Sequence, residues 1–143
     1  MITGLVGFAI LAVILLLVVA VAREPGPPPE EVAVAYELAW DRLDFDALWT
    51  LSTRELRDGR PRVEFIVAKR AAYAGQHGLT GLVTNVVIEE ILTGADVALV
   101  RTRLELRHGR AVHDQLRLER RDGTWRVAAY DLQRDAPAPR LPG

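Results

Sequence analysis

The chain contains 143 residues, carries a formal net charge of −1 and has no cysteine. Without cysteine, disulfides, thiolate catalysis and cysteine-ligated zinc are excluded. A net charge this close to zero gives no overall field that would draw the protein to nucleic acid, so we expect no nucleic-acid partner.

Residues 2–22 contain no charged side chain. Because about 20 apolar residues in a helix cross a hydrocarbon core of about 30 Å, this run predicts a transmembrane anchor over residues 1–23. The protein would then be a single-pass protein of the cell membrane, with the lipid bilayer as a partner. Residues 20–22 (Ala-Val-Ala) also fit a signal-peptide cleavage site, but the run lacks a basic start and is long for a signal peptide. Arg23, the basic residue beside the run, favours a cytoplasmic domain.

Residues 24–29 hold four prolines and predict a stiff spacer. Apolar positions at 3–4 residue spacing then predict a helix over residues 30–43. Asp44 is a plausible N-cap for a second helix that runs to about Leu56, and Pro61 begins a third that ends near Ala74.

From Leu82 onward the period changes from 3.6 to 2. Four strands are predicted, over residues 82–92, 96–107, 111–121 and 124–132. Their connections are short, so the sheet is expected to be an antiparallel meander. The helices and strands together form one domain over residues 30–133, and residues 134–143 are predicted to be a flexible tail.

The strand pattern brings two carboxylates together. Asp122 and Gly123 predict a two-residue hairpin turn, and regular pairing from that turn places Asp114 directly opposite Asp131 on the apolar face. Opposed carboxylates on such a face repel, so one binds a proton more tightly. The pair is therefore the candidate catalytic centre, acting as general base and hydrogen-bond donor. The alternative is that both carboxylates are solvated or paired at the open end of the sheet.

Two segments carry a family resemblance. Residues 40–49 (Trp-Asp-Arg-Leu-Asp-Phe-Asp-Ala-Leu-Trp) join a long helix to a short one, and residues 122–130 (Asp-Gly-Thr-Trp-Arg-Val-Ala-Ala-Tyr) form the closing strand. With the order of the elements, they resemble the nuclear-transport-factor-two-like superfamily, the cystatin-like cone fold that includes ketosteroid isomerases and polyketide cyclases. The resemblance implies an α+β fold with three helices packed on a curved four-stranded antiparallel sheet around an apolar pocket. It transfers no catalytic role from ketosteroid isomerases, and the fold does not decide the function.

Two groups of side chains suggest binding surfaces. Mainly aromatic residues are predicted to line the pocket, with the domain core as their alternative place: Tyr36, Trp40, Trp49, Tyr73, Leu104 and Trp125. The opposite sheet face carries the predicted interaction residues Arg101, Arg103, Arg107 and Arg117.

Residues 101–126 carry a net charge of +4, and residues 30–58 a net charge of −5. The basic face could meet anionic headgroups, a membrane-associated protein or the acidic helices of a second copy in a homodimer. The alternative is a solvated face with cross-strand Arg–Glu pairs.

No metal or cofactor is expected. The three histidines lack ligand spacing, Ser52 has no visible base, and no Gly-rich phosphate loop follows a strand. The sequence therefore favours a membrane-anchored, non-enzymatic binding or interaction module, such as an accessory subunit of a membrane-associated complex. The alternative is an acid–base enzyme resembling an isomerase, dehydratase or cyclase that acts on a small hydrophobic substrate.

Overall fold

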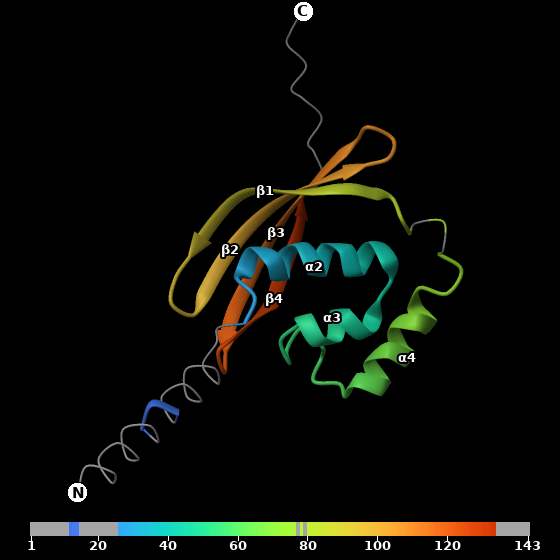
Figure 1. The fold of residues 1–143 in the computed structure, drawn as a ribbon. Helices are drawn as coiled ribbons and strands as arrows, with labels where there is room; N and C mark the ends of the chain where they lie inside the picture. The colour runs from blue at the N-terminus through green and yellow to red at the C-terminus, as the bar shows by residue number, and fades with distance from the viewer. Residues whose placement is uncertain (1–11, 15–25, 77, 79, 134–143) are drawn as a thin grey trace, which may run out of the picture.

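The computed structural model describes residues 12–14, 26–76, 78 and 80–133 (Figure 1). Three helices precede four strands: α2 (Pro29–Arg42), α3 (Phe45–Leu51), α4 (Arg62–Ala72), β1 (Val83–Thr93), β2 (Val97–Leu106), β3 (Ala111–Arg121) and β4 (Thr124–Gln133). The strands form one antiparallel sheet in the order β1-β2-β3-β4, which confirms the predicted meander.

The predicted fold class also contained a transmembrane helix, and this part is corrected. Among the residues that the structure describes, no helix is both long enough and apolar enough to cross a membrane. Except for residues 12–14, the predicted anchor lies outside the described residues, as do residues 24 and 25 of the predicted spacer and the whole of the predicted tail. Apart from residues 12–14, which are helical, the described residues form the α+β domain and the end of the spacer before it.

Local chemistry explains where the helices begin and end. Pro29 occupies the first turn of α2, where its missing N–H costs nothing, and Leu43 ends the helix in the left-handed conformation. The Asp44 side chain then accepts a hydrogen bond from the Ala47 N–H at 3.1 Å, which confirms the predicted N-cap of α3.

The second helix is shorter than predicted. It ends at Leu51, because Ser52 is extended and forms an isolated parallel bridge to Val127 on β4. The Thr53 N–H donates to the Val127 carbonyl at 2.9 Å, so pairing with the edge of the sheet replaces the last helical turns. This pairing fastens the segment after α3 to β4.

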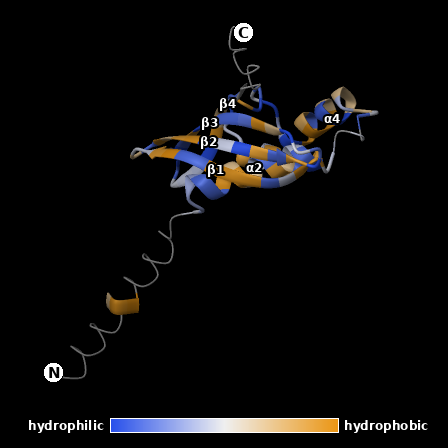
Figure 2. Ribbon diagram, turned by 90° about the horizontal axis from the view of Figure 1, so that it is seen from above, coloured by the Kyte–Doolittle hydropathy of each residue, from blue (hydrophilic) through white to orange (hydrophobic). Residues whose placement is uncertain are grey.

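The sheet curves over α2, which packs against β1, β2 and β4, while α3 packs against β4 and α2 (Figure 1). Viewed from above, α4 lies at one end of the molecule, where it packs on α3 (Figure 2). The sequence predicted that all three helices pack on the sheet. This is wrong for α4, which packs on α3 instead. The core between α2 and the sheet includes Ala33, Tyr36, Val100, Leu116 and Val127.

A bulge in β4 changes the predicted register. Leu118 pairs with Val127, but Arg117 pairs with Ala129, so Ala128 is an extra residue without a partner. Each residue after the bulge lies on the face opposite to the one that regular alternation predicts. The hairpin pairs that precede the bulge, up to Leu118 with Val127, follow the prediction.

Candidate functional site

A cavity of about 470 Å³ opens between α2 and the concave face of the sheet. This volume lies within the range of sites that hold small molecules. Its lining comes from α2, the start of β1 and the three following strands: Tyr36, Glu37, Trp40, Asp41, Leu82, Val83, Leu104, Leu106, Val112, Asp114 and Tyr130. Most of these side chains are apolar or aromatic, as is typical of ligand pockets.

Two buried carboxyl groups meet in this cavity. Glu37 on α2 is 5% exposed and Asp114 on β3 is 3% exposed. Glu37 is hydrogen-bonded to Asp114, and its Oε1 accepts a hydrogen bond from the Thr102 hydroxyl on β2 at 3.1 Å. Thr102 and Asp114 are direct cross-strand neighbours, so the sheet presents both to the same part of α2.

The environment of this pair favours the protonated form of Glu37. Burial comes first among the causes, followed by the hydrogen bond to Asp114 and the negative charge of Asp114, and together they raise the pKa of Glu37 to about 9. The Glu37 carboxyl therefore stays protonated at neutral pH, and its O–H donates a hydrogen bond to Asp114. The arrangement is a carboxylic acid hydrogen-bonded to a carboxylate, which can both give and accept a proton.

Asp41 holds one wall of the cavity in place. Its Oδ1 accepts hydrogen bonds from the backbone N–H groups of Leu82 at 2.9 Å and Val83 at 3.1 Å. Its backbone carbonyl also accepts from Gly81 at 3.0 Å. These bonds fasten the start of β1 to the C-terminal end of α2.

Three aromatic rings form another wall. The centroid of Tyr36 lies 6.5 Å from that of Trp40 and 5.9 Å from that of Tyr130, and the Trp40 and Tyr130 centroids are 6.5 Å apart. Burial raises the pKa of both tyrosine hydroxyls, so both stay neutral hydrogen-bonding groups. Tyr36 is buried, whereas Tyr130 is 47% exposed and so also reaches solvent.

The residues predicted to line the pocket separate into two groups. Tyr36, Trp40 and Leu104 line this cavity, whereas Trp49, Tyr73 and Trp125 pack elsewhere. The Trp49 ring lies 3.7 Å from the Arg57 guanidinium carbon, and its Nε1 donates to the Arg60 carbonyl at 3.1 Å.

The other two aromatic residues pack within the domain. Tyr73 follows α4 and packs on Trp40 and Phe45. Trp125 belongs to the core, and the guanidinium carbon of Arg120 lies 5.6 Å from the centroid of its ring.

The predicted pairing of Asp114 with Asp131 is wrong. Asp114 pairs with Leu132, and Asp131 pairs with Gln115 on the opposite face, where it is exposed. The bulge at Ala128 is the cause, because it turns Tyr130 toward the cavity instead of Asp131.

Glu37 was missed in the sequence, although a signal was present. It lies next to Tyr36 and one helical turn after Ala33, both of which are buried, so it borders the apolar stripe of α2. A carboxyl group at the border of a buried stripe either reaches solvent or finds a partner across the core. The partner here comes from β3, a part of the chain that helical periodicity does not describe.

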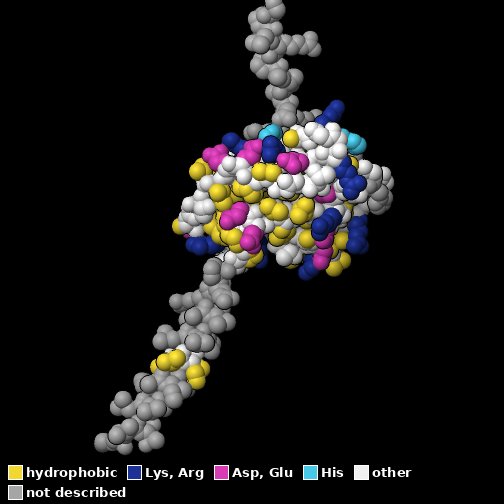
Figure 3. Space-filling model, turned by 45° about the horizontal axis from the view of Figure 1, so that its top comes forward, with side chains coloured by type: hydrophobic (Ala, Val, Ile, Leu, Met, Phe, Trp, Pro, Cys, Tyr) yellow, Lys and Arg dark blue, Asp and Glu magenta, His cyan; other side chains and the backbone are white. Residues whose placement is uncertain are grey.

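The predicted interaction residues lie on the outer face of the sheet, which faces away from α2. Arg101 pairs with Glu90 at 3.2 Å, and Arg117 pairs with Glu119 at 3.5 Å. Arg107 is exposed beside the turn between β2 and β3. In a space-filling view, acidic side chains, basic side chains and histidine lie close together along the upper edge, and hydrophobic and further charged side chains share the surface below it (Figure 3).

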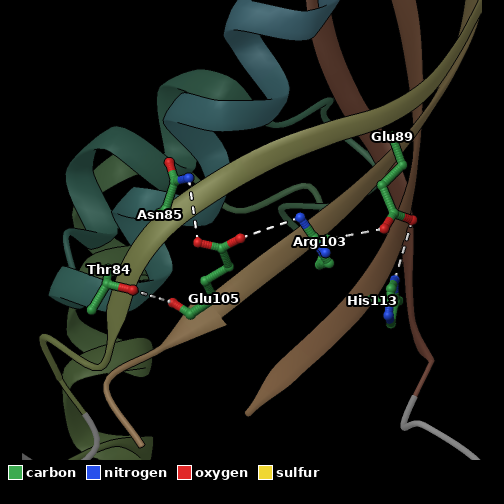
Figure 4. Close-up of polar contacts among 6 residues, drawn as sticks. All are labelled: Thr84, Asn85, Glu89, Arg103, Glu105 and His113. Atoms are coloured by element: carbon green, nitrogen blue, oxygen red, sulfur yellow. Dashed lines mark hydrogen bonds and ion pairs between the residues drawn. The ribbon is translucent and has the colours of Figure 1, made fainter. Parts of the chain in front are cut away.

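A close-up of the outer face shows a chain of polar contacts that centres on Arg103 (Figure 4). Arg103 lies 3.2 Å from Glu105 and 3.8 Å from Glu89, and Glu89 also lies 3.2 Å from Nδ1 of His113. Arg103, like Arg101 and Arg117, thus has a carboxylate neighbour within the domain, as the alternative of Arg–Glu pairs expects. Among the described residues, no cluster of three His, Asp or Glu side chains could hold a metal ion.

No family model and no curated protein matches the sequence. Similar solved structures exist. A candidate NTF2-like transpeptidase from Campylobacter jejuni is 19% identical, with a TM-score of 0.57, over 72% of this chain and 99% of its own. A SEC-C motif containing protein from Rhodopseudomonas palustris is 16% identical, with a TM-score of 0.52, over 72% of this chain and 77% of its own. An NTF-2-like protein of unknown function from Silicibacter pomeroyi is 19% identical, with a TM-score of 0.46, over 73% and 92%.

The domain has an NTF2-like fold. This agrees with the resemblance seen in the sequence, but at such identities the likeness concerns the fold alone and transfers no activity. The predicted partners and localisation stay predictions.

Proposed function

We propose that this domain is a binding module that takes up a small, mainly apolar molecule in the cavity between α2 and the sheet. The cavity itself carries the proposal: it measures about 470 Å³, and its apolar and aromatic walls surround one buried polar pair. Sites of this composition gain affinity from apolar burial and orientation from a few polar groups. A module of this kind suits an accessory subunit of a larger complex.

A cavity-filling substitution tests the proposal. The neutral fluorescent probe N-phenyl-1-naphthylamine is titrated into the full chain, into Leu104→Trp and into Leu92→Trp. Leu104 lines the cavity, whereas Leu92 is exposed near the end of β1 and serves as the matched control. We expect saturable binding by the wild type and by Leu92→Trp, and a loss of about tenfold or more in Leu104→Trp, because the indole occupies the site. Equal binding by all three proteins would contradict the proposal.

A second function, acid–base catalysis, is favoured by the two buried carboxyl groups of Glu37 and Asp114, which line the same cavity and of which Glu37 has a raised pKa. Asp114 would act as general base and Glu37 as general acid on a small hydrophobic substrate. The test follows deuterium exchange next to the carbonyl of cyclohexanone by NMR. Exchange that is faster than in buffer and is lost in both Asp114→Asn and Glu37→Gln supports an enzyme. The same exchange rate in all three proteins would contradict the enzyme hypothesis, and the binding module would remain the proposed function.

A further inference from the structure

We propose that the ligand of this cavity is an organic ammonium, an apolar molecule with a protonated amine whose N–H groups donate to the pair of Glu37 and Asp114. The inference rests on the proposed function, since it names the chemistry of the molecule that fills the same cavity. Charge, hydrogen bonding and aromatic geometry each support it.

The charge of the cavity wall has one sign. The lining residues include three carboxyl groups, Glu37, Asp41 and Asp114, but no Lys, Arg or His. Asp41 is compensated by the backbone N–H groups of Leu82 and Val83. Glu37 and Asp114 have no cationic side chain as a partner among the described residues. A buried carboxylate without a counter-ion is costly, so a cationic ligand relieves a cost that a neutral ligand leaves in place.

Asp114 also has unused capacity to accept hydrogen bonds. Asp114 is 3% exposed, and its buried Oδ1 meets no hydrogen-bond donor among the described residues. A carboxylate has about four acceptor positions, and buried acceptors in proteins are almost always satisfied. An ammonium supplies N–H donors that are charge-assisted, which are the strongest kind for a carboxylate.

The aromatic wall suits the same ligand. Tyr36, Trp40 and Tyr130 line the cavity together with the carboxyl pair, and their ring centroids lie 5.9 to 6.5 Å apart. Aromatic faces attract cations through the ring quadrupole, and cavities built from several rings recognise ammonium groups.

Binding of a cation should release the proton of Glu37. The titratable groups around Glu37 are Tyr36 and Asp41 on α2, Asp114 on β3 and Tyr130 on β4, while the lining residues from β1 and β2 are apolar. None of these groups is a cation. A bound ammonium therefore lowers the pKa of Glu37, because its positive charge favours the ionised carboxylate, and this favours release of the proton to solvent.

The experiment compares two probes of similar shape, cyclohexylmethylamine and cyclohexylmethanol. Both are titrated into the full chain by calorimetry near neutral pH, in two buffers with different heats of ionisation. We expect the amine to bind about tenfold more tightly or better and to release protons, up to about one per molecule bound. Glu37→Gln should release none, and Asp114→Asn should lose the preference for the amine. Asp131→Asn, which changes an exposed carboxylate on the outer face, should behave as the wild type.

Equal or tighter binding of the alcohol overturns the ammonium inference but leaves the proposed binding function standing. If neither probe binds, both proposals fail. Preferential binding of the amine without proton release overturns the coupling to Glu37. If Glu37→Gln does not fold, as judged by circular dichroism, the preference lost in Asp114→Asn decides the inference.

Discussion

The side chains of Glu37 on α2 and Asp114 on β3 are hydrogen-bonded inside the cavity, and Thr102 on β2 donates to the same Glu37 carboxyl. Three elements thus meet at one buried acid. Because removing charge from water is costly, the pair is stable only while it holds a proton. This relationship connects the stability of the fold to the chemistry of the site.

The first prediction concerns stability against pH. Folding raises the pKa of Glu37 from 4.5 to about 9, so between these values the folded state holds a proton that the unfolded state has lost. The contribution of Glu37 is therefore fully present below the unfolded pKa and is lost as pH rises toward the folded one. We expect it to fall by up to about 1.4 kcal/mol per pH unit within this window.

Urea denaturation at several pH values between about 5 and about 8 measures this effect. The control is Glu37→Gln, which keeps both an acceptor for Thr102 and a donor for Asp114 but does not titrate. The free energy of unfolding of the wild type, relative to this variant, should decline as pH rises. A difference that is independent of pH would show that Glu37 does not hold an additional proton in the folded state.

The second prediction separates the partners of Glu37. Asp114→Asn removes a negative charge beside Glu37, so the pKa of Glu37 should fall by about one unit or more. Asp131→Asn should leave that pKa unchanged, because Asp131 lies on the other face of the sheet. Carbon-13 NMR of the Glu37 carboxyl follows the titration in each protein. Equal midpoints in the wild type and in Asp114→Asn would show that Asp114 carries no charge near Glu37.

The third prediction concerns the wall of the cavity. Asp41→Ala removes the acceptor for the Leu82 and Val83 N–H groups, and we expect a loss of about 2–4 kcal/mol in the free energy of unfolding. Asp41→Asn keeps an oxygen in the same place and should lose under about 1.5 kcal/mol. Urea denaturation gives both values, and faster amide exchange at Leu82 and Val83 should locate the defect. If both variants lose the same stability, the hydrogen bonds are not what fastens β1.

Most of the fold could be predicted from local patterns. The helices begin near Pro29, Phe45 and Arg62, as proline, N-cap and apolar spacing indicate. The four strands follow the period of two and the Gly-containing turns. The end of α3 could not be predicted, because the bridge between Ser52 and Val127 is a contact between distant segments.

The candidate site could be predicted only in part. Tyr36, Trp40 and Leu104 were placed at the pocket from aromatic spacing and strand alternation, and they line it. Asp114 was placed on the correct face because β3 alternates regularly from Leu118 through Leu116 to Asp114. Glu37 was missed because its place depends on packing between helix and sheet. Tyr130 was missed because its face depends on a bulge, and the residue types at Ala128 and Ala129 do not indicate a bulge.

The last prediction tests that bulge by removing it. In Val127-Ala128-Ala129, deletion of Ala128 leaves a regular strand in which Val127 still pairs with Leu118 and Ala129 with Arg117. Tyr130 then remains on the cavity face and Asp131 on the outer face. The deletion removes only the local bend, so the free energy of unfolding should fall by under about 2 kcal/mol.

The matched control is deletion of Glu119, which also shortens the β3–β4 hairpin by one residue but at a regularly paired position. It forces the part of β3 before the deletion to change faces, which turns Arg117 toward the core, or else it enlarges the bulge in β4. Burial of an unpaired charge should cost at least about 3 kcal/mol, or prevent folding. Urea denaturation ranks the two deletions, and NMR contacts between Gln115 and Asp131 report the register. If the two deletions destabilise equally, or the contacts between Gln115 and Asp131 vanish when Ala128 is removed, the extra residue of β4 does not lie at Ala128.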